Sequence, residues 1–128
     1  MTVSEVRLVK AWHAALNDGD VERLAALSHP DVQVGGPRGI GHGVQLLRQW
    51  VGRAGVHLEI RRVFHQADTV VVEQRAEWRS AGQVSDSQTV GSVFVIRDGQ
   101  VVRVVRYPDL TNALGAANLD ESHETRSD

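Results

Sequence analysis

The sequence contains no cysteine, no long apolar run and no clustered excess of basic residues. The lack of cysteine excludes thiol catalysis, disulfides and zinc sites built on cysteine. No apolar stretch approaches the roughly 18 residues of a membrane span, and the first ten residues lack the pattern of a signal peptide. The 14 basic and 16 acidic residues nearly balance, which argues against a nucleic-acid surface. We therefore expect a cytoplasmic protein that binds neither membrane nor nucleic acid.

The spacings that commonly hold metals and cofactors are also missing. None of the six histidines forms a His-x-His or His-x-x-x-His pair, so a metal site has no local support. The glycine-rich segment 35–43 is not followed by the Lys-Ser/Thr pair of a phosphate-binding loop. We expect neither a metal nor an organic cofactor.

The 128 residues suit one domain large enough to bury a core without a disulfide or a metal. We expect this domain at residues 1–118 and a disordered polar tail at 119–128. Apolar residues at three- and four-residue steps predict helices at 4–17, 20–27, 44–53 and 110–118. Strands are predicted at 31–34, 56–65, 69–80, 83–97 and 100–107, with Asp98-Gly99 as a strong hairpin turn. The segment 35–43 is expected to be a loop, either a plain connection or a lid.

Four short segments carry a resemblance to a known group of proteins. They are AALNDGD at 14–20, Ala26-Leu27, GQVV at 99–102 and YPD at 107–109. Together with the order of the elements, over about residues 4–118, they resemble the SnoaL-like and ketosteroid isomerase-like group of the nuclear transport factor 2-like superfamily. This resemblance implies an α+β, cone-shaped fold, in which a curved, mostly antiparallel sheet wraps around three helices and encloses a pocket. Because one scaffold hosts many activities, it does not imply a reaction.

The comparison with the isomerases places non-catalytic residues at their three catalytic positions. The oxyanion tyrosine falls on Trp12, the general-base aspartate on Gly36 and the protonated aspartate on Gly91. A glycine cannot abstract a proton, and an indole N–H is a donor of different shape and reach. In this register a steroid isomerase mechanism is rejected.

Strand alternation predicts which residues face the pocket. In 69–80 the set Gln74, Ala76 and Trp78 is expected to face inward, and in 100–107 the set Val102, Val104 and Arg106. Arg106 would extend an apolar face, so it needs an anionic ligand, an internal partner or a place at the rim. Candidate internal partners are Asp31, Asp86 and Asp109. The expected ligand-binding residues are Trp12, Trp50, Gln74, Trp78, Val104 and Arg106, although each tryptophan alone also fits ordinary core packing.

An acid or base for catalysis has weaker support. His13 on the first helix and His42 in the glycine-rich segment are the leading histidines. Asp109 is a further candidate, although it also suits the N-cap of the last helix. These residues leave it open whether the protein is an enzyme.

We expect the protein to bind a small, mostly apolar or amphipathic molecule in the cone. One alternative is a cofactor-independent cyclase, isomerase, dehydratase or hydrolase that uses a histidine or aspartate with Arg106. Another is a dimeric interaction module. Glu73, Arg75, Glu77 and Arg79 form a ladder of alternating charge, which fits either a solvated face or a contact between copies. The resemblance implies a homodimer through the sheet.

Overall fold

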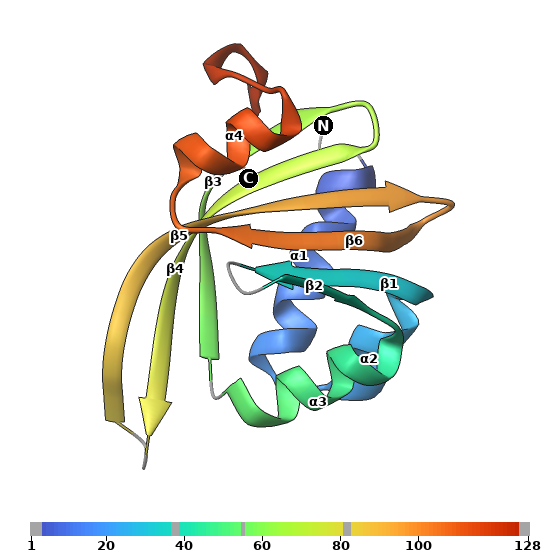
Figure 1. Ribbon diagram of the computed structural model, residues 1–128, viewed down its shortest axis with the longest axis vertical. Helices are drawn as coiled ribbons and strands as arrows, with labels where there is room; N and C mark the ends of the chain where they lie inside the picture. Colours follow the sequence, from blue (N-terminus) through green and yellow to red (C-terminus); the bar gives the residue numbers. More distant parts are fainter. Residues whose placement is uncertain (1–3, 37–38, 55, 81–82, 126–128) are drawn as a thin grey trace.

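The computed structural model describes residues 4–36, 39–54, 56–80 and 83–125. Helices gather on one side of a long, curved sheet, and a further helix lies on its other side (Figure 1). The helices are α1 (Ser4–Asn17), α2 (Val21–Ala26), α3 (Val44–Ala54), α4 (Leu110–Ala117) and the short η1 (Glu121–His123). The strands are β1 (Ser28–Gly36), β2 (Gly39–His42), β3 (Val56–Gln66), β4 (Thr69–Ser80), β5 (Gln83–Arg97), β6 (Gln100–Tyr107) and β7 (Glu124–Thr125).

Helix α1 buries one face against the sheet and ends at a polar turn. Its buried positions include Val9, Trp12 and Leu16, at three- and four-residue steps. The side chain of Asn17, at its end, donates to the carbonyl of Leu58 and accepts from the amide of Leu58, at 2.8 and 2.9 Å. This amide pair mimics a strand partner and fixes the end of α1 on β3.

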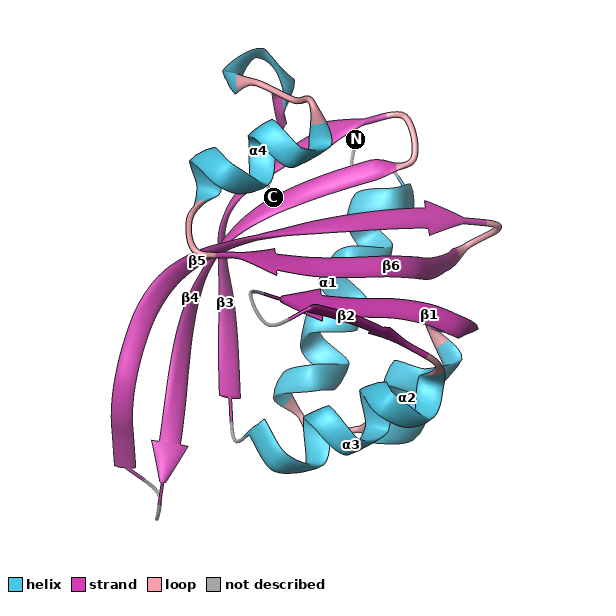
Figure 2. Ribbon diagram, viewed as in Figure 1, coloured by secondary structure: helices cyan, strands magenta, loops and turns pink. Residues whose placement is uncertain are grey.

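The sheet runs in the order β2-β1-β6-β5-β4-β3-β7 (Figure 2). Strands β3 to β6 form an antiparallel meander, and β1 joins β6 in parallel. The turn between β5 and β6 has positive φ at both Asp98 and Gly99, at 52° and 75°. Two positive φ values are those of a type I′ hairpin, the turn that an Asp-Gly pair favours.

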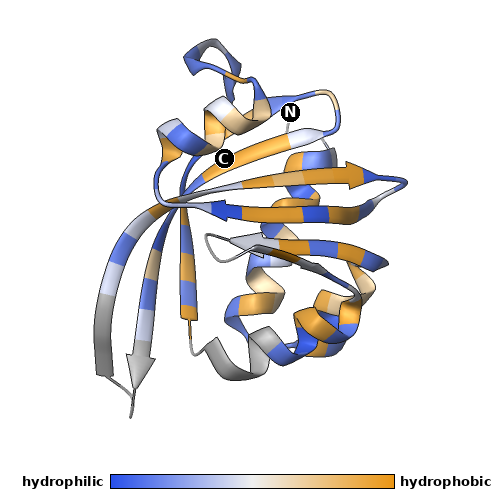
Figure 3. Ribbon diagram, in the orientation of Figure 1, coloured by the Kyte–Doolittle hydropathy of each residue, from blue (hydrophilic) through white to orange (hydrophobic). Residues whose placement is uncertain are grey.

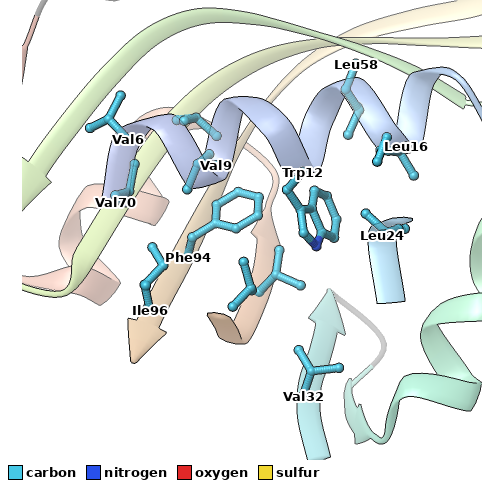
Figure 4. Close-up of a cluster of buried hydrophobic side chains, with 14 of the residues drawn as sticks. Val6, Val9, Trp12, Leu16, Leu24, Val32, Leu58, Val70, Phe94 and Ile96 are labelled. Carbon is cyan, nitrogen blue, oxygen red and sulfur yellow. The ribbon is translucent and has the colours of Figure 1, made fainter. Parts of the chain in front are cut away.

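Apolar residues on the two faces of the sheet form two separate cores. The larger core lies between α1–α3 and the concave face, where Trp12 packs edge-on against Phe94 with ring centroids 5.2 Å apart (Figure 4). The smaller core lies under α4 and contains Phe64 and Val71. Apolar and polar segments follow one another along β6 (Figure 3), whose buried residues are Val101, Val104 and Val105. The mixed α+β fold with a curved, unclosed sheet is confirmed.

The prediction of a loop or lid at 35–43 is wrong for the described part of that segment. Residues at both of its ends belong to the antiparallel pair β1–β2, with Gly35 opposite Ile40 and Gly36 opposite Gly39. Because glycine has no side chain, the apolar–polar alternation that marks a strand is absent here. The first strand is correspondingly longer than predicted. Residues 37 and 38, including Arg38, lie outside the described residues.

The prediction of a disordered tail at 119–128 is wrong up to residue 125. Leu119 is buried in the smaller core, and β7 pairs with β3 at the edge of the sheet. Arg62 of β3 forms ion pairs with Glu121 and Glu124, at 2.6 and 2.8 Å. The tail looked disordered because its polar residues point to solvent while a single leucine anchors it. Residues 126–128 lie outside the described part.

None of the helices in the described ranges has the length and apolar character needed to cross a membrane.

Candidate functional site

A cavity of about 720 Å³ lies between the helices and the concave face of the sheet. Its size falls in the usual range of small-molecule sites. The apolar side chains that line it are Trp12, Val34, Leu46, Val56, Leu58, Phe94 and Val104. Four glycines of the β1–β2 hairpin also line it: Gly35, Gly36, Gly39 and Gly41. The polar side chains among the described lining residues are Gln74, Ser92 and Arg106.

Four of the six expected ligand-binding residues lie at this cavity. They are Trp12, Gln74, Val104 and Arg106. Trp78 is instead a half-buried residue packed against the larger core, outside the described lining. The side chain of Trp50 lies outside the described part of the chain, and of the other two tryptophans Trp12 lines the cavity and Trp78 does not. The indole N–H of Trp12 donates to Ser28 Oγ at 3.2 Å and is therefore already used within the protein.

Arg106 shares the cavity face of β6 with Val104, but Val102 does not. A register shift opposite Val95 and Ile96 adds one residue to β6, so Val101 rather than Val102 joins the larger core. Such a bulge breaks simple alternation, and for this reason the predicted set failed at Val102. Arg106 itself is half-buried.

The guanidinium of Arg106 has no hydrogen-bond or ion-pair partner among the residues and side chains that the structure describes. Two of its proposed partners lie elsewhere. Asp31 is exposed, and Asp109 caps α4 by accepting from the amide of Asn112 at 2.8 Å. The side chain of the third, Asp86, lies outside the described part. Arg106 therefore brings a cation and several unused N–H donors to a mostly apolar cavity.

Ser92 lies directly opposite Arg106 in the β5–β6 register, and both line the cavity. Side chains at such a cross-strand pair have Cβ atoms about 5 Å apart. The Ser92 hydroxyl donates to Gln74 Oε1 at 2.7 Å. Alternation along β5 places Ser92 on the same face as Val90 and Phe94, a signal in the sequence that the prediction overlooked.

Gly91, the expected counterpart of the isomerase's protonated aspartate, faces away from the cavity. A Cβ at Gly91 would lie 2.7 Å from the carbonyl oxygen of Asp109 and 2.8 Å from Cβ of Ala113. A side chain at this position would point into α4, so Gly91 is not a position from which a side chain could reach the cavity. Ser92 is the neighbouring residue that lines the cavity, and a serine is not a carboxylic acid.

None of the three candidate acid–base residues lines the cavity. His42 is exposed at the end of β2, and Asp109 is the helix cap described above. His13 is buried behind Gln74, with its Nε2 2.7 Å from the Gln74 side-chain nitrogen. Its Nδ1 lies 2.7 Å from the carbonyl oxygen of Val9. Burial lowers the pKa of His13 to about 4, so the imidazole is neutral at pH 7.

Comparisons with known proteins identify the fold. In structure, the chain is similar to an NTF2-like protein of unknown function from Cytophaga hutchinsonii, with a TM-score of 0.73 and 13% identity over 88% of this chain and 96% of that one. It is similar to TerC co-crystallised with polyporic acid, with a TM-score of 0.74 and 23% identity over 89% and 97% of the two chains. It is also similar to an LEH-like epoxide hydrolase of M. tuberculosis, with a TM-score of 0.73 and 23% identity over 90% and 95%.

The sequence comparisons agree with this assignment. No curated protein matches the sequence significantly. The sequence profile of the SnoaL-like domain matches residues 9–104, which span α1 to the middle of β6. The chain therefore belongs to the SnoaL-like domain family of the nuclear transport factor 2-like superfamily.

Proposed function

We propose that the protein binds a small, mostly apolar molecule in the cavity between α1–α3 and the sheet. The observation that carries this proposal is a mostly apolar cavity of about 720 Å³ that is lined by Arg106, whose guanidinium has no partner among the side chains that the structure describes. An apolar cavity of this size offers a ligand many van der Waals contacts. A single cation in such a space fixes the orientation of whatever enters.

The guanidinium of Arg106 favours a ligand that carries a polar oxygen atom. A guanidinium taken partly out of water needs acceptors, and the described residues supply none. A carboxylate, phenolate or carbonyl oxygen on the ligand would supply them, and a charge-assisted hydrogen bond is about twice as strong as a neutral one. The ligand is therefore amphipathic, with an apolar body and at least one oxygen at the Arg106 end.

The cavity supports binding better than acid–base catalysis. Among its described lining residues there is no carboxyl or imidazole group, and His13 reaches the cavity only through Gln74. Similar folds accept small molecules, as the structure of TerC with polyporic acid illustrates. At 23% identity, that likeness shows the fold and not the ligand.

The experiment that tests the proposal is a titration with 2-naphthoate, a two-ring acid, followed by isothermal calorimetry or ligand-observed NMR. We expect binding to the wild-type protein and roughly tenfold weaker binding to Arg106→Met, because the charge-assisted contact is lost. Arg103→Met is the matched control on the same strand, since Arg103 bonds to Gln33 Oε1 at 2.7 Å and does not line the cavity. Equal affinity for Arg106→Met and wild type would refute the role of Arg106. Absence of binding to all three proteins would count against the cavity as a site for such molecules.

We also propose that a second copy of the chain pairs with the outer face of the sheet. Helix α4 covers only the part of this face that carries the smaller core. Beyond it, a polar hollow is lined by Arg61, Glu73, Arg75, Ser87, Gln88 and Thr89. A face with charges of both signs is able to pair with itself across a two-fold axis.

A further inference from the structure

A chain of hydrogen bonds leads from the backbone of α1 to the cavity. It runs from the carbonyl of Val9 to His13, from His13 to Gln74, and from Gln74 to Ser92. His13, Gln74 and Ser92 are all buried, with 3%, 1% and 4% of their surface exposed. Bulk water is therefore a poor substitute partner for them, and each group depends on its neighbour in the chain.

The direction of every bond in this chain follows from its first member. A carbonyl oxygen only accepts, so Nδ1 of His13 carries the proton and donates to Val9. The neutral ring then has a bare Nε2, which accepts from the side-chain N–H of Gln74. This fixes the Gln74 amide with its nitrogen toward His13 and its oxygen toward Ser92. The Ser92 hydroxyl must accordingly donate to Gln74 Oε1.

The only hydroxyl proton of Ser92 is thus engaged inside the protein. What Ser92 can offer to a molecule in the cavity is lone pairs, so it acts toward the cavity as an acceptor. Arg106, directly opposite on β6, offers only donors. The two residues place an acceptor and a donor side by side on one wall of the cavity.

From this arrangement, and resting on the proposed function above, we infer that the ligand carries a carbonyl-type oxygen next to an O–H or N–H group. The oxygen accepts from Arg106, and the neighbouring O–H or N–H donates to Ser92. Hydroxy ketones, hydroxy acids and primary amides on an apolar body have this polar end. A molecule with acceptors alone satisfies Arg106 and leaves the lone pairs of Ser92 without a partner. His13 and Gln74 are positioning residues, because they act by orienting Ser92.

The test compares two probes that differ by one group, 2-naphthamide and 2-acetylnaphthalene. Both have the same two rings and a carbonyl, and the NH₂ of the amide is replaced by a CH₃ of similar size. The amide loses more hydrogen bonds to water on entering an apolar site, so without an acceptor it binds more weakly than the ketone. With Ser92 as acceptor, we expect the wild-type protein to bind the amide roughly fivefold more tightly than the ketone.

Two variants test the chain of hydrogen bonds directly. Ser92→Ala removes the acceptor, and we expect the preference to reverse in favour of the ketone. His13→Phe keeps a ring against Trp12 and Phe94 but removes the acceptor that orients Gln74, so we expect the affinity ratio to fall toward one. Thr111→Ala, on the exposed side of α4, is the matched control and keeps the wild-type ratio. The ratio of two affinities in one protein is insensitive to a general loss of stability.

The outcomes separate this inference from the proposed function. Equal or tighter binding of the ketone by the wild-type protein overturns the inference while leaving the cavity as a binding site. The same holds if the amide preference survives in Ser92→Ala, or if 2-naphthoate binds and neither neutral probe does. If none of the three probes binds, the proposed function fails together with the inference.

Discussion

Mild acidification should destabilise the folded protein through His13. Burial lowers the pKa of this imidazole from 6.5 to about 4 in the folded state. Between these values the unfolded chain binds a proton that the folded chain does not, so the free energy of unfolding falls as the pH falls. The contribution of neutral His13 to the free energy of unfolding is fully present above about pH 6.5 and is lost progressively toward pH 4. From the two pKa values, the loss between pH 7.5 and pH 5 is about 2 kcal/mol.

The assay is urea unfolding of wild type and His13→Phe at several values between pH 7.5 and pH 5. We expect the variant to be less stable at every pH, because Gln74 loses its acceptor, but to lack the pH-dependent loss of about 2 kcal/mol. Carboxylates do not obscure this comparison. The pKa values of Glu22, Asp120 and Glu124 are lowered by hydrogen bonds to Arg48, Ser122 and Arg62, so their stabilisation is lost only as the pH falls further.

Parallel pH profiles for the two proteins would refute the reasoning. A second measurement makes the same test without a variant, since the ring resonances of His13 can be followed by NMR in the folded protein. They are expected to keep the neutral Nδ1–H form down to pH 5. A transition near pH 6.5 would show that the ring is solvated and that the hydrogen-bond chain to Ser92 is not as described.

Three further predictions concern other parts of the molecule. Gly91→Ala should destabilise the protein by about 1–3 kcal/mol, because the added Cβ would meet the backbone of α4. Gly115→Ala has open space around the added Cβ and should stabilise the protein by about 0.5–1 kcal/mol. Thermal or urea unfolding of both variants checks these values. Deletion of residues 119–128 should cost about 2 kcal/mol or more by removing Leu119 from the smaller core, and unchanged stability would show that the tail is dispensable. Light scattering should give the mass of a dimer for the wild-type protein, and Arg75→Glu, on the outer face of β4, should shift it toward the monomer at low micromolar concentration. A wild-type monomer would refute that pairing.

The long elements were predictable because each carries a strong local signal. Helix α1 and strands β4, β5 and β6 begin and end where the periodicity and the turns at Asn17–Asp20 and Asp98-Gly99 place them. In each case the local pattern and the buried face agree, and this agreement is typical of sequences that specify one fold. The N-cap role of Asp109 was predictable for the same reason.

The errors lie where tertiary contacts override the local pattern. The glycines of the β1–β2 hairpin give no alternation, and pairing with β1 alone makes β2 a strand. The bulge in β6 moved Val102 off the cavity face, and the buried Leu119 anchored a segment of otherwise polar composition. Trp78 faces the concave side as predicted, but no local pattern says how far a cavity extends.

The sequence alone could not predict that Ser92 acts as an acceptor toward the cavity, because the direction of its hydroxyl depends on residues of three elements, α1, β4 and β5. The tautomer of His13 follows from a carbonyl on α1, the amide orientation of Gln74 from that tautomer, and the hydroxyl direction from the amide. Stability and ligand preference therefore depend on the same ring. A proton on Nε2 would convert it to a donor, the amide of Gln74 would have to turn, and the hydroxyl proton of Ser92 would be released toward the cavity. The preference for the amide should then persist at every pH at which His13 of the folded protein is neutral. It should weaken only near pH 4, where most of the His13-dependent part of the free energy of unfolding has already been lost.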